Sequence, residues 1–204
     1  MTTKVAAVML TYNVEDIILR SIQRVRPYVD YILVVDGKST DNTLREITGF
    51  ADKIVLAGKD CKDFAKLRNF AQTQVSVNID WCLHVDADEL WTEQFLGRIR
   101  EIIKEYPDAC SFRFPRENIE EGKKQKGIDY QVRLVQRSMA VWKRKVHEIP
   151  YHRLKDRPLG IIGSPDCINL TEHTITHMQR NKDIRDNIQV RWKEIAKPKQ
   201  GERH

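Results

Sequence analysis

Short apolar runs alternate with amphipathic stretches through the first half of the chain. Four of these runs have the length and the β-branched content of buried strands: residues 4–11, 31–35, 53–56 and 80–86. Apolar residues recur at helical spacing in residues 13–26, 40–50, 63–74 and 92–106. Strand and helix thus alternate four times, which predicts an α/β domain with a mostly parallel central sheet and helices on both faces.

Capping residues set the helix boundaries that we expect. Asn13 or the acidic residues after it can begin the first helix, which ends before Pro27. Ser39 or Thr40 is expected to cap the second helix, which runs through Phe50.

The second half of the chain has a different pattern. Alternation of apolar and polar side chains predicts half-exposed strands at residues 109–115, 129–136, 141–142 and 159–162. Residues 117–127 between them predict a polar loop, and Val146–Pro150 is expected at the end of one of these strands. This half is therefore expected to be a smaller, mixed β region.

The chain is long enough for one domain with a substantial core. We expect a single domain, in which residues 1–106 form the α/β half and residues 107–180 the mixed β half. An amphipathic helix is predicted over residues 181–197, and a loose tail over residues 198–204.

Composition adds few constraints. A hydrophobic fraction of 41% and a charged fraction of 31% are ordinary for a globular protein. The apolar run Val5–Leu10 is too short for a signal-peptide core or a membrane span, so we expect a cytoplasmic protein. The four cysteines form no C-x-x-C pair, which favours reduced, structural thiols over disulfides or a zinc site.

The net charge of +6 is concentrated in one segment. Residues 116–157 contain 12 Lys or Arg and 6 Asp or Glu, and the remainder of the chain is neutral. Such a segment is either a solvated surface or a surface that attracts an anionic partner.

Polar clusters follow three of the predicted strands: Thr11–Asn13, Asp36–Ser39 and Asp86–Asp88. Ligands of open α/β sheets bind outside the carboxyl ends of the strands, so these clusters are expected to share one crevice. Asp86 and Asp88 point the same way if the chain is still extended there, and a divalent cation such as Mg²⁺ or Mn²⁺ would offset their repulsion. Alternatively, Asp86 ends the strand while Asp88 and Glu89 cap the following helix.

Four sequence blocks carry a resemblance to a known family: Leu10–Asn13 with Glu15, Val34–Thr43, Lys66–Ala71 and His84–Glu89. Their order and spacing over residues 4–105 are more specific than any single motif, and weaker similarity continues through Tyr130–Val135 and Val146–Glu148. The chain resembles family 2 glycosyltransferases of the GT-A fold, including small bacterial glucosyltransferases of the lipopolysaccharide core. Lys38 departs from the family, which often has a small or acidic residue there.

The resemblance implies a nucleotide-sugar site in residues 1–106 and an acceptor site in residues 107–180. Tyr12, Asn13 and Glu15, which follow Thr11, would line the nucleoside pocket, and Asp36 would hydrogen-bond the base. The other implied donor contacts are Lys66 and Arg68 to the base or diphosphate, Asp86 to the ribose or metal, and Asp88 to the metal. Simpler roles are packing for Tyr12, a turn or cap for Asp36, and a surface charge for Arg68.

The resemblance also implies inversion at the anomeric carbon, which requires a general base. Glu148 is the first candidate, His147 could share its role or bind the metal, and Glu89 is the second carboxylate candidate. His177, like His173, is a candidate for a metal or diphosphate contact.

The leading hypothesis is a metal-dependent, inverting glycosyl transfer from a nucleotide-sugar, expected to be a UDP-sugar, with Mn²⁺ or Mg²⁺ as cofactor. The basic segment would face an anionic acceptor, such as a lipid-linked or core oligosaccharide at the inner face of the membrane. An alternative acceptor is phage DNA that contains hydroxymethylated bases. A nucleotidyltransferase would need a glycine-rich phosphate loop after the first strand, but residues 11–14 contain no glycine, which argues against that class. A non-catalytic nucleic-acid-binding protein would leave the acidic crevice unexplained.

Overall fold

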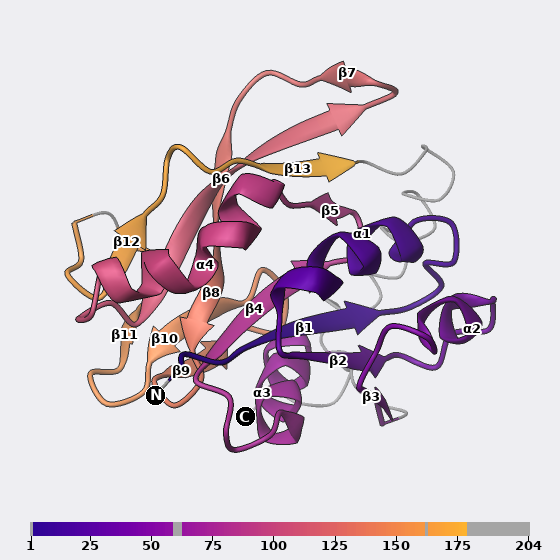
Figure 1. Ribbon diagram of the computed structural model, residues 1–204, viewed down its shortest axis with the longest axis horizontal. Helices are drawn as coiled ribbons and strands as arrows, with labels where there is room; N and C mark the ends of the chain where they lie inside the picture. The colour runs from indigo at the N-terminus through magenta and orange to yellow at the C-terminus, as the bar shows by residue number, and fades with distance from the viewer. Residues whose placement is uncertain (1, 59–62, 162, 179–204) are drawn as a thin grey trace, which may run out of the picture.

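The computed structural model describes residues 2–58, 63–161 and 163–178. The strands of its larger sheet are β1 (Val5–Thr11), β2 (Tyr31–Asp36), β3 (Lys53–Leu56), β4 (Trp81–Asp86), β5 (Glu89–Leu90), β6 (Ser111–Glu120), β7 (Lys123–Lys124), β8 (Asp129–Gln136), β12 (Cys167–Asn169) and β13 (Ile175–Met178). Their order is β3-β2-β1-β4-β8-β6-β13-β5, and β7 and β12 also pair with β6 (Figure 1).

The first four strands in that order run parallel to one another. β8 is antiparallel to both β4 and β6, so it joins the α/β half of the chain to the β half. The predicted α/β fold with a mostly parallel central sheet is therefore confirmed.

Helices cover both faces of the parallel strands. They are α1 (Ile18–Val25), the short 3-10 helix η1 (Arg26–Tyr28), α2 (Thr43–Ile47), α3 (Phe64–Gln74) and α4 (Glu93–Glu105). Successive residues of β1 point to opposite faces, so Val5, Ala7 and Met9 share a core with α1, α2 and α4. Ala6 and Val8 instead share a core with α3.

A second sheet lies beside α3 and consists of β9 (Ala140–Lys143), β10 (Ile149–His152) and β11 (Arg157–Pro158) in antiparallel order. The side-chain amide of Asn69 both donates to the carbonyl and accepts from the N–H of Trp142, each at 2.8 Å. After β11 the chain passes close to β8. A Cβ atom on Gly160 (φ +96°) would come within 2.5 Å of Val132 Cγ2, so only glycine fits there.

Two of the predicted helix starts are wrong. Helix α1 begins at Ile18, because Asn13 is in the left-handed region (φ 49°) and its side-chain oxygen accepts from the N–H of Thr40 at 2.8 Å. Neither Ser39 nor Thr40 caps α2, which is only five residues long. Both residues instead bond to the loop after β1 or to Asp36, so tertiary contacts override the local capping preference. The helices expected at residues 63–74 and 92–106 are found as α3 and α4, with Asp63 and Thr92 as their N-caps.

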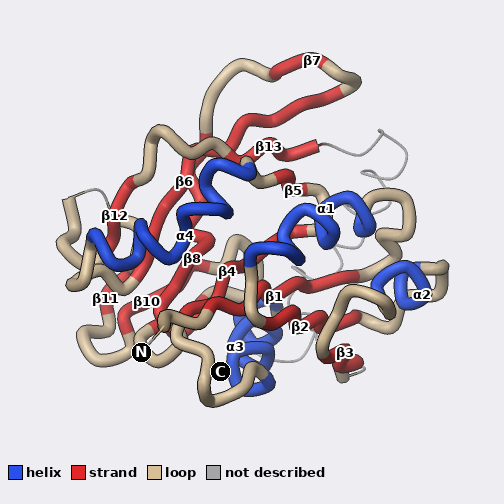
Figure 2. Tube along the Cα trace, viewed as in Figure 1, coloured by secondary structure: helices blue, strands red, loops and turns tan. Residues whose placement is uncertain are grey.

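Several predictions for the second half are also wrong. The expected polar loop at residues 117–127 is largely a hairpin, in which β6 continues to Glu120 and pairs with β7. Figure 2 shows this hairpin extending from the rest of the molecule. Val146–Glu148 precedes β10 rather than ending a strand. Residues 159–161 follow β11 and are not in a strand, and residue 162 of the strand expected there lies outside the described residues. The sequence pattern missed β5, β12 and β13, because each is short and mixes polar with apolar residues, unlike the apolar run of β3.

The predicted helix over residues 181–197 and the tail lie outside the described residues, and the division at residue 106 stays a prediction. Cys82, Cys110 and Cys167 are buried free thiols, as expected. In the described ranges, no helix is both long enough and apolar enough to span a membrane.

Candidate functional site

The carboxyl ends of three neighbouring strands lie side by side. Thr11 at the end of β1 is in register with Asp36 at the end of β2, and Leu10 is in register with Asp86 at the end of β4. The three predicted polar clusters therefore meet at one edge of the sheet, as the sequence indicated.

Asp36 is fully buried and holds the loop that follows β2. Its carboxylate accepts from Thr11 Oγ1 at 2.8 Å, and from the N–H and the hydroxyl of Ser39 at 2.7 Å each. These bonds assign Asp36 a role in shaping the loop, and its burial leaves it unexposed to a nucleotide base.

The loops after β1 and β2 are cross-linked by short polar side chains. Ser39 Oγ accepts from the N–H of Asn13 at 2.9 Å, and Thr43 Oγ1 accepts from the N–H of Val14 at 2.8 Å. Glu15 accepts from the N–H of Asn42 at 2.7 Å. Asn13 and Glu15 thus fix the shape of the predicted nucleoside pocket through its backbone.

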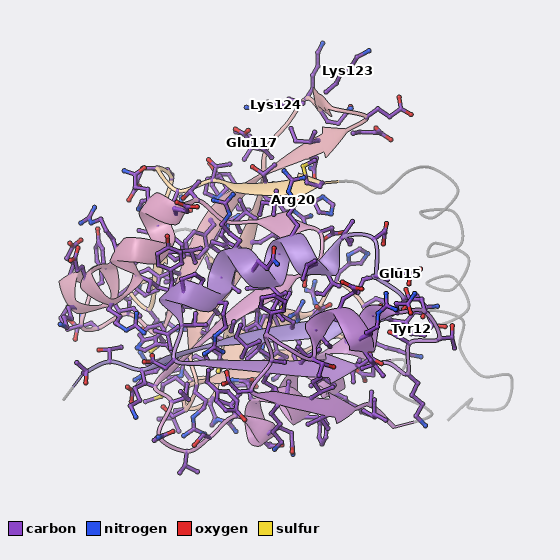
Figure 3. All side chains as sticks on the ribbon, turned by 45° about the vertical axis from the view of Figure 1, so that its right-hand side comes forward. Tyr12, Glu15, Arg20, Glu117, Lys123 and Lys124 are labelled. Atoms are coloured by element: carbon purple, nitrogen blue, oxygen red, sulfur yellow. The ribbon has the colours of Figure 1, made fainter. Side chains whose placement is uncertain are left out.

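Tyr12 is an exposed aromatic residue of this region, with 38% of its surface open to solvent. Its ring lies over Gly37, where an added Cβ would be 3.3 Å from Tyr12 Cδ2. Figure 3 shows Tyr12 and Glu15 close together at one end of the molecule. A flat aromatic surface at a strand end is suitable for stacking a nucleoside base.

Two buried arginines hold Asp86. Arg68 of α3 donates from Nη2 to Asp86 Oδ1 at 3.1 Å, and Arg133 of β8 donates from Nη2 to Asp86 Oδ2. Both arginines are at least 95% buried. Burial opposes ionisation of Asp86, but Arg133 and Arg68 more than offset it and keep the pKa of this carboxyl well below its ordinary value. Asp86 is therefore charged at neutral pH.

Glu89 lies behind Asp86 and is completely buried. Its Oε1 accepts from Arg133 Nε at 3.1 Å and lies 3.6 Å from Arg116 Nη1. Burial, only partly offset by Arg133, raises the pKa of Glu89. A carboxylate with no exposed surface is not placed to touch an acceptor hydroxyl, so the geometry does not support Glu89 as a general base.

Asp88 and His177 come together although 89 residues separate them in the sequence. β4 ends at Asp86 and a turn follows, so the expectation that Asp86 and Asp88 project together from an extended strand is wrong. Asp88 turns instead to β13, where its Oδ2 is 3.1 Å from His177 Nε2. His177 Nδ1 is 2.6 Å from Asn118 Oδ1, which orients the ring. Burial lowers the pKa of His177, but the bond to Asp88 outweighs it and raises that pKa.

This pair is not a complete metal site. Over the described ranges, no three His, Cys, Asp or Glu side chains form a group that could hold a metal ion. Both oxygens of Asp86 already accept from arginine, so Asp88 and His177 are the side chains of this edge that could ligate a metal. His173 is elsewhere: it is buried against Phe95 of α4.

Glu148 lies beside the arginine cluster, because its Oε1 accepts from Arg68 Nε at 2.8 Å. His147 next to it is exposed and has a φ of 54°. Lys66 is 79% exposed and lies 4.0 Å from Asp63, so it is not drawn into the cluster. Of the basic residues predicted on α3, the structure brings only Arg68 to Asp86.

Sequence reasoning missed Arg133, which links Asp86 to Glu89. The available signal was a single arginine inside the apolar run Val132–Val135 of a predicted strand. It also missed His84, whose Nδ1 lies 3.3 Å from Arg68 Nη1 and whose ring contacts Trp142 edge-on. Burial and the neighbouring arginines lower the pKa of His84 well below its ordinary value, so it is neutral.

Sequence comparison matches residues 6–194 to the family described as Glycosyl transferase family 2. An uncharacterized glycosyltransferase of Rickettsia conorii is 29% identical over 135 residues, which cover 66% of this chain and 41% of the relative. An uncharacterized glycosyltransferase of Rickettsia bellii is 30% identical over 135 residues, which cover 66% of this chain and 39% of the relative. The chain thus spans about 40% of the length of these curated relatives.

Solved structures share the fold. Staphylococcus aureus TarS has a TM-score of 0.58 at 14% identity, covering 93% of this chain and 39% of TarS. Mannosyl-3-phosphoglycerate synthase from Rubrobacter xylanophilus has a TM-score of 0.58 at 16% identity (93% and 70%). Glucosyl-3-phosphoglycerate synthase from Mycobacterium tuberculosis, in complex with Mn²⁺, UDP-glucose and phosphoglyceric acid, has a TM-score of 0.57 at 13% identity (95% and 77%). At these identities the likeness establishes the fold alone, and it is the predicted GT-A fold.

Proposed function

The chain belongs to glycosyl transferase family 2, and we propose that it transfers a sugar from a UDP-sugar to a hydroxyl group of an anionic acceptor, with inversion and with a divalent cation. A lipid-linked or core oligosaccharide would suit the basic second half of the chain. The observation that carries this proposal is the contact of Asp88 with His177, beside the edge where β1, β2 and β4 end.

Asp88 and His177 are the residues that would hold the cation, Mn²⁺ or Mg²⁺. Two protein ligands suffice when a bound diphosphate and water supply the remaining oxygens. The cation would stabilise the negative charge that develops on the leaving diphosphate. Asp86 fits the ribose better than the metal, because the two arginines already occupy both of its oxygens.

The donor would bind over the loops after β1 and β2. Tyr12 offers an exposed ring for the base, while Asp36, Asn13 and Glu15 hold the loops in shape. Support for this nucleotide comes from the Mycobacterium tuberculosis neighbour, which was solved with Mn²⁺ and UDP-glucose.

Glu148 is our choice for the general base. Only its Oε1 has a hydrogen-bond partner within the described ranges, so Oε2 is the atom that we assign to the proton. The acceptor oxygen would attack the anomeric carbon as its proton passes to Glu148. The bond from that carbon to the diphosphate oxygen would break, and its electron pair would leave with the diphosphate.

The first experiment is a thermal-shift and calorimetric titration with UDP and UDP-sugars, with and without Mn²⁺. Wild type should be stabilised by UDP only when Mn²⁺ is present, and by about 2.7 kcal/mol when the ligand is at 100 times its Kd. Asp88→Ala should lose this response, whereas Asp108→Ala, which changes an exposed carboxylate after α4, should keep it. Absence of any metal-dependent response to nucleotides in wild type would refute the proposed function.

A second experiment separates the base from the donor site. Glu148→Gln should lower the turnover of donor sugar by about 10²–10⁴-fold while UDP–Mn²⁺ affinity stays near that of wild type. Full turnover in Glu148→Gln would remove Glu148 from the mechanism and leave the donor site intact.

A further inference from the structure

The loop between β9 and β10, residues 144–148, ends with the proposed general base, Glu148. Three basic or titratable residues of this loop precede Glu148 and are exposed: Arg144, Lys145 and His147. Glu148 in turn reaches Arg68 and, through it, Asp86. A basic surface is thus attached to the edge of the sheet where transfer would take place.

Helix α3 fixes this loop at three places. Asn69 makes two hydrogen bonds to the backbone of Trp142, just before the loop. Within the loop, the N–H of Phe64 donates to the carbonyl of Lys145 at 2.9 Å. At its end, Arg68 holds Glu148. The loop is therefore a positioned platform on α3 and not a free connection.

The backbone of the loop is strained at two residues. Arg144 (φ 72°) and His147 (φ 54°) are both in the left-handed region, although neither is glycine. Such a conformation costs a side-chain-bearing residue about 1 kcal/mol or more. Strain of this kind gathers at ligand-binding sites, where the surrounding contacts maintain it.

Most of the positive charge of the second half is already paired. The hairpin portion, residues 116–129, is neutral, with four Lys or Arg and four Asp or Glu. Residues 133–157 hold eight Lys or Arg and two Asp or Glu. Those engaged with carboxylates or backbone carbonyls are Arg133, Arg137, Lys143, Arg153, Lys155 and Arg157. Arg144 and Lys145 remain, and the described part of the chain gives neither of them an ion pair.

We propose that the platform at residues 144–148 binds an acidic group of the acceptor, a phosphate or a carboxylate, through Arg144 and Lys145. The group would lie close to the hydroxyl that Glu148 deprotonates, so the platform would select acceptors by charge and orient them. This inference rests on the proposed function and narrows its acceptor side to one loop.

The neutral hairpin and the small size of the platform favour a compact anionic group over a nucleic acid. Duplex DNA presents a charge about every 1.7 Å, and proteins that bind it neutralise several phosphates along a surface. Lys123 and Lys124 do not extend the platform toward the donor loops: Figure 3 shows them at the tip of the hairpin, far from Tyr12, and Lys124 is paired with Glu117 at 2.6 Å.

The test is calorimetry on the full chain saturated with UDP and Mn²⁺, titrated with glycerol 1-phosphate, glycerate and glycerol. Wild type should bind one of the two anions about tenfold or more tightly than glycerol, and the preferred anion identifies the acidic group. Arg144→Gln/Lys145→Gln should lose about tenfold of that affinity while its UDP–Mn²⁺ affinity is unchanged. Arg20→Gln/Lys104→Gln, which removes the same charge from exposed positions on α1 and α4, should bind like wild type.

Three results would overturn the inference. The first is equal binding of glycerol and both anions, and the second is an equal loss in both double variants, since either would show a non-specific charge effect. The third is tight binding of duplex DNA that depends on Arg144 and Lys145 when neither small anion binds, which would assign the platform to a nucleic acid. If UDP–Mn²⁺ fails to bind wild type, the proposed function itself fails and takes this inference with it. If wild type still binds UDP–Mn²⁺, a failure of the anion tests contradicts only the role of the platform and leaves the proposed function intact.

Discussion

The two sides of the site are built from different interactions. On the proposed donor side, the loops after β1 and β2 are joined by hydrogen bonds in which backbone N–H groups of one loop donate to side-chain oxygens of the other. In the cluster around Asp86, Arg68 and Arg133 are instead buried against Asp86 and Glu89. Losing one neutral hydrogen bond costs about 1 kcal/mol, whereas removing one member of a buried ion pair leaves an uncompensated charge and costs about 3–5 kcal/mol.

This difference predicts which part of the site tolerates substitution. The donor loops have several weak links in parallel, so one substitution should alter their shape only in part. The arginine cluster is a single connected unit, in which Arg133 contacts both Asp86 and Glu89, so a change at one residue reaches the others. Four substitutions test the comparison.

Arg133→Met should have the largest effect. It leaves Glu89 buried without its main partner and should lower the free energy of unfolding by about 4 kcal/mol, measured by urea denaturation. Adding Glu89→Gln should restore part of the loss, because the uncompensated charge is removed. Arg113→Met, at a partly exposed arginine on the neighbouring strand β6, should cost less than about 1 kcal/mol. Equal losses in the single and double variants at Arg133 and Glu89 would contradict the charge argument.

Gly160→Ala tests whether packing on β8 matters apart from charge. The added Cβ would clash with Val132 at 2.5 Å and sit at φ +96°, so we expect a loss of about 3 kcal/mol in the same denaturation experiment. Gly163→Ala has a similar φ (+80°) and nothing within 4 Å of its Cβ, and it should lose only about 1 kcal/mol. If the two variants are equally stable, the close approach of Gly160 to β8 is not a constraint.

Asp36→Asn breaks the donor side at its most connected residue. An amide has one accepting oxygen instead of two, so part of the set of bonds from Thr11 and Ser39 is lost, at a cost of about 2 kcal/mol. Ser39→Ala, which removes a hydroxyl and keeps the N–H, should cost about 1 kcal/mol. A loss at Asp36 as large as that at Arg133 would erase the distinction between the two sides.

Asp41→Asn should have the smallest effect, visible only as a change in pH dependence. Burial opposes ionisation of Asp41, but hydrogen bonds from Thr43 and the N–H of Glu15 outweigh it and lower its pKa below 3.8. A lowered folded-state pKa stabilises the protein above the unfolded value near 3.8, and that contribution disappears as the pH falls through the folded value. The urea midpoint of wild type should therefore fall more steeply with decreasing pH than that of Asp41→Asn. If the two midpoints fall in parallel, the proposed contribution of the Asp41 carboxylate to stability is contradicted.

The sequence predicted the α/β half well because its signals are local. The apolar runs at residues 4–11, 31–35 and 80–86 are long enough to show as strands, and Asp63 and Thr92 are caps beside the helices they begin. The prediction that Ser39 caps the second helix was wrong because its hydroxyl instead donates to Asp36 at the end of β2. The short strands β5 and β13, one from each half of the chain, gave no pattern, although together they place His177 beside Asp88.

The candidate site shows the same division. Sequence position alone placed Thr11, Asp36 and Asp86 at strand ends, and parallel pairing brought these ends together. No local pattern in the sequence showed which of these side chains are free of other contacts. Asp36 is held by bonds within its own loop, and both oxygens of Asp86 accept from arginines of two other elements.

By itself, therefore, the sequence determined the order of strands and helices and the positions of the carboxylates at the strand ends, because hydrophobic periodicity and chain direction fix both. Only the tertiary structure decided the charge pairing: Asp86 meets Arg133 from 47 residues away, and Asp88 meets His177 from 89 residues away. A linear pattern shows where a charge lies along the chain. Its partner is chosen by the packing of β8 and β13 into the sheet, where desolvation makes an unpaired charge too costly to keep.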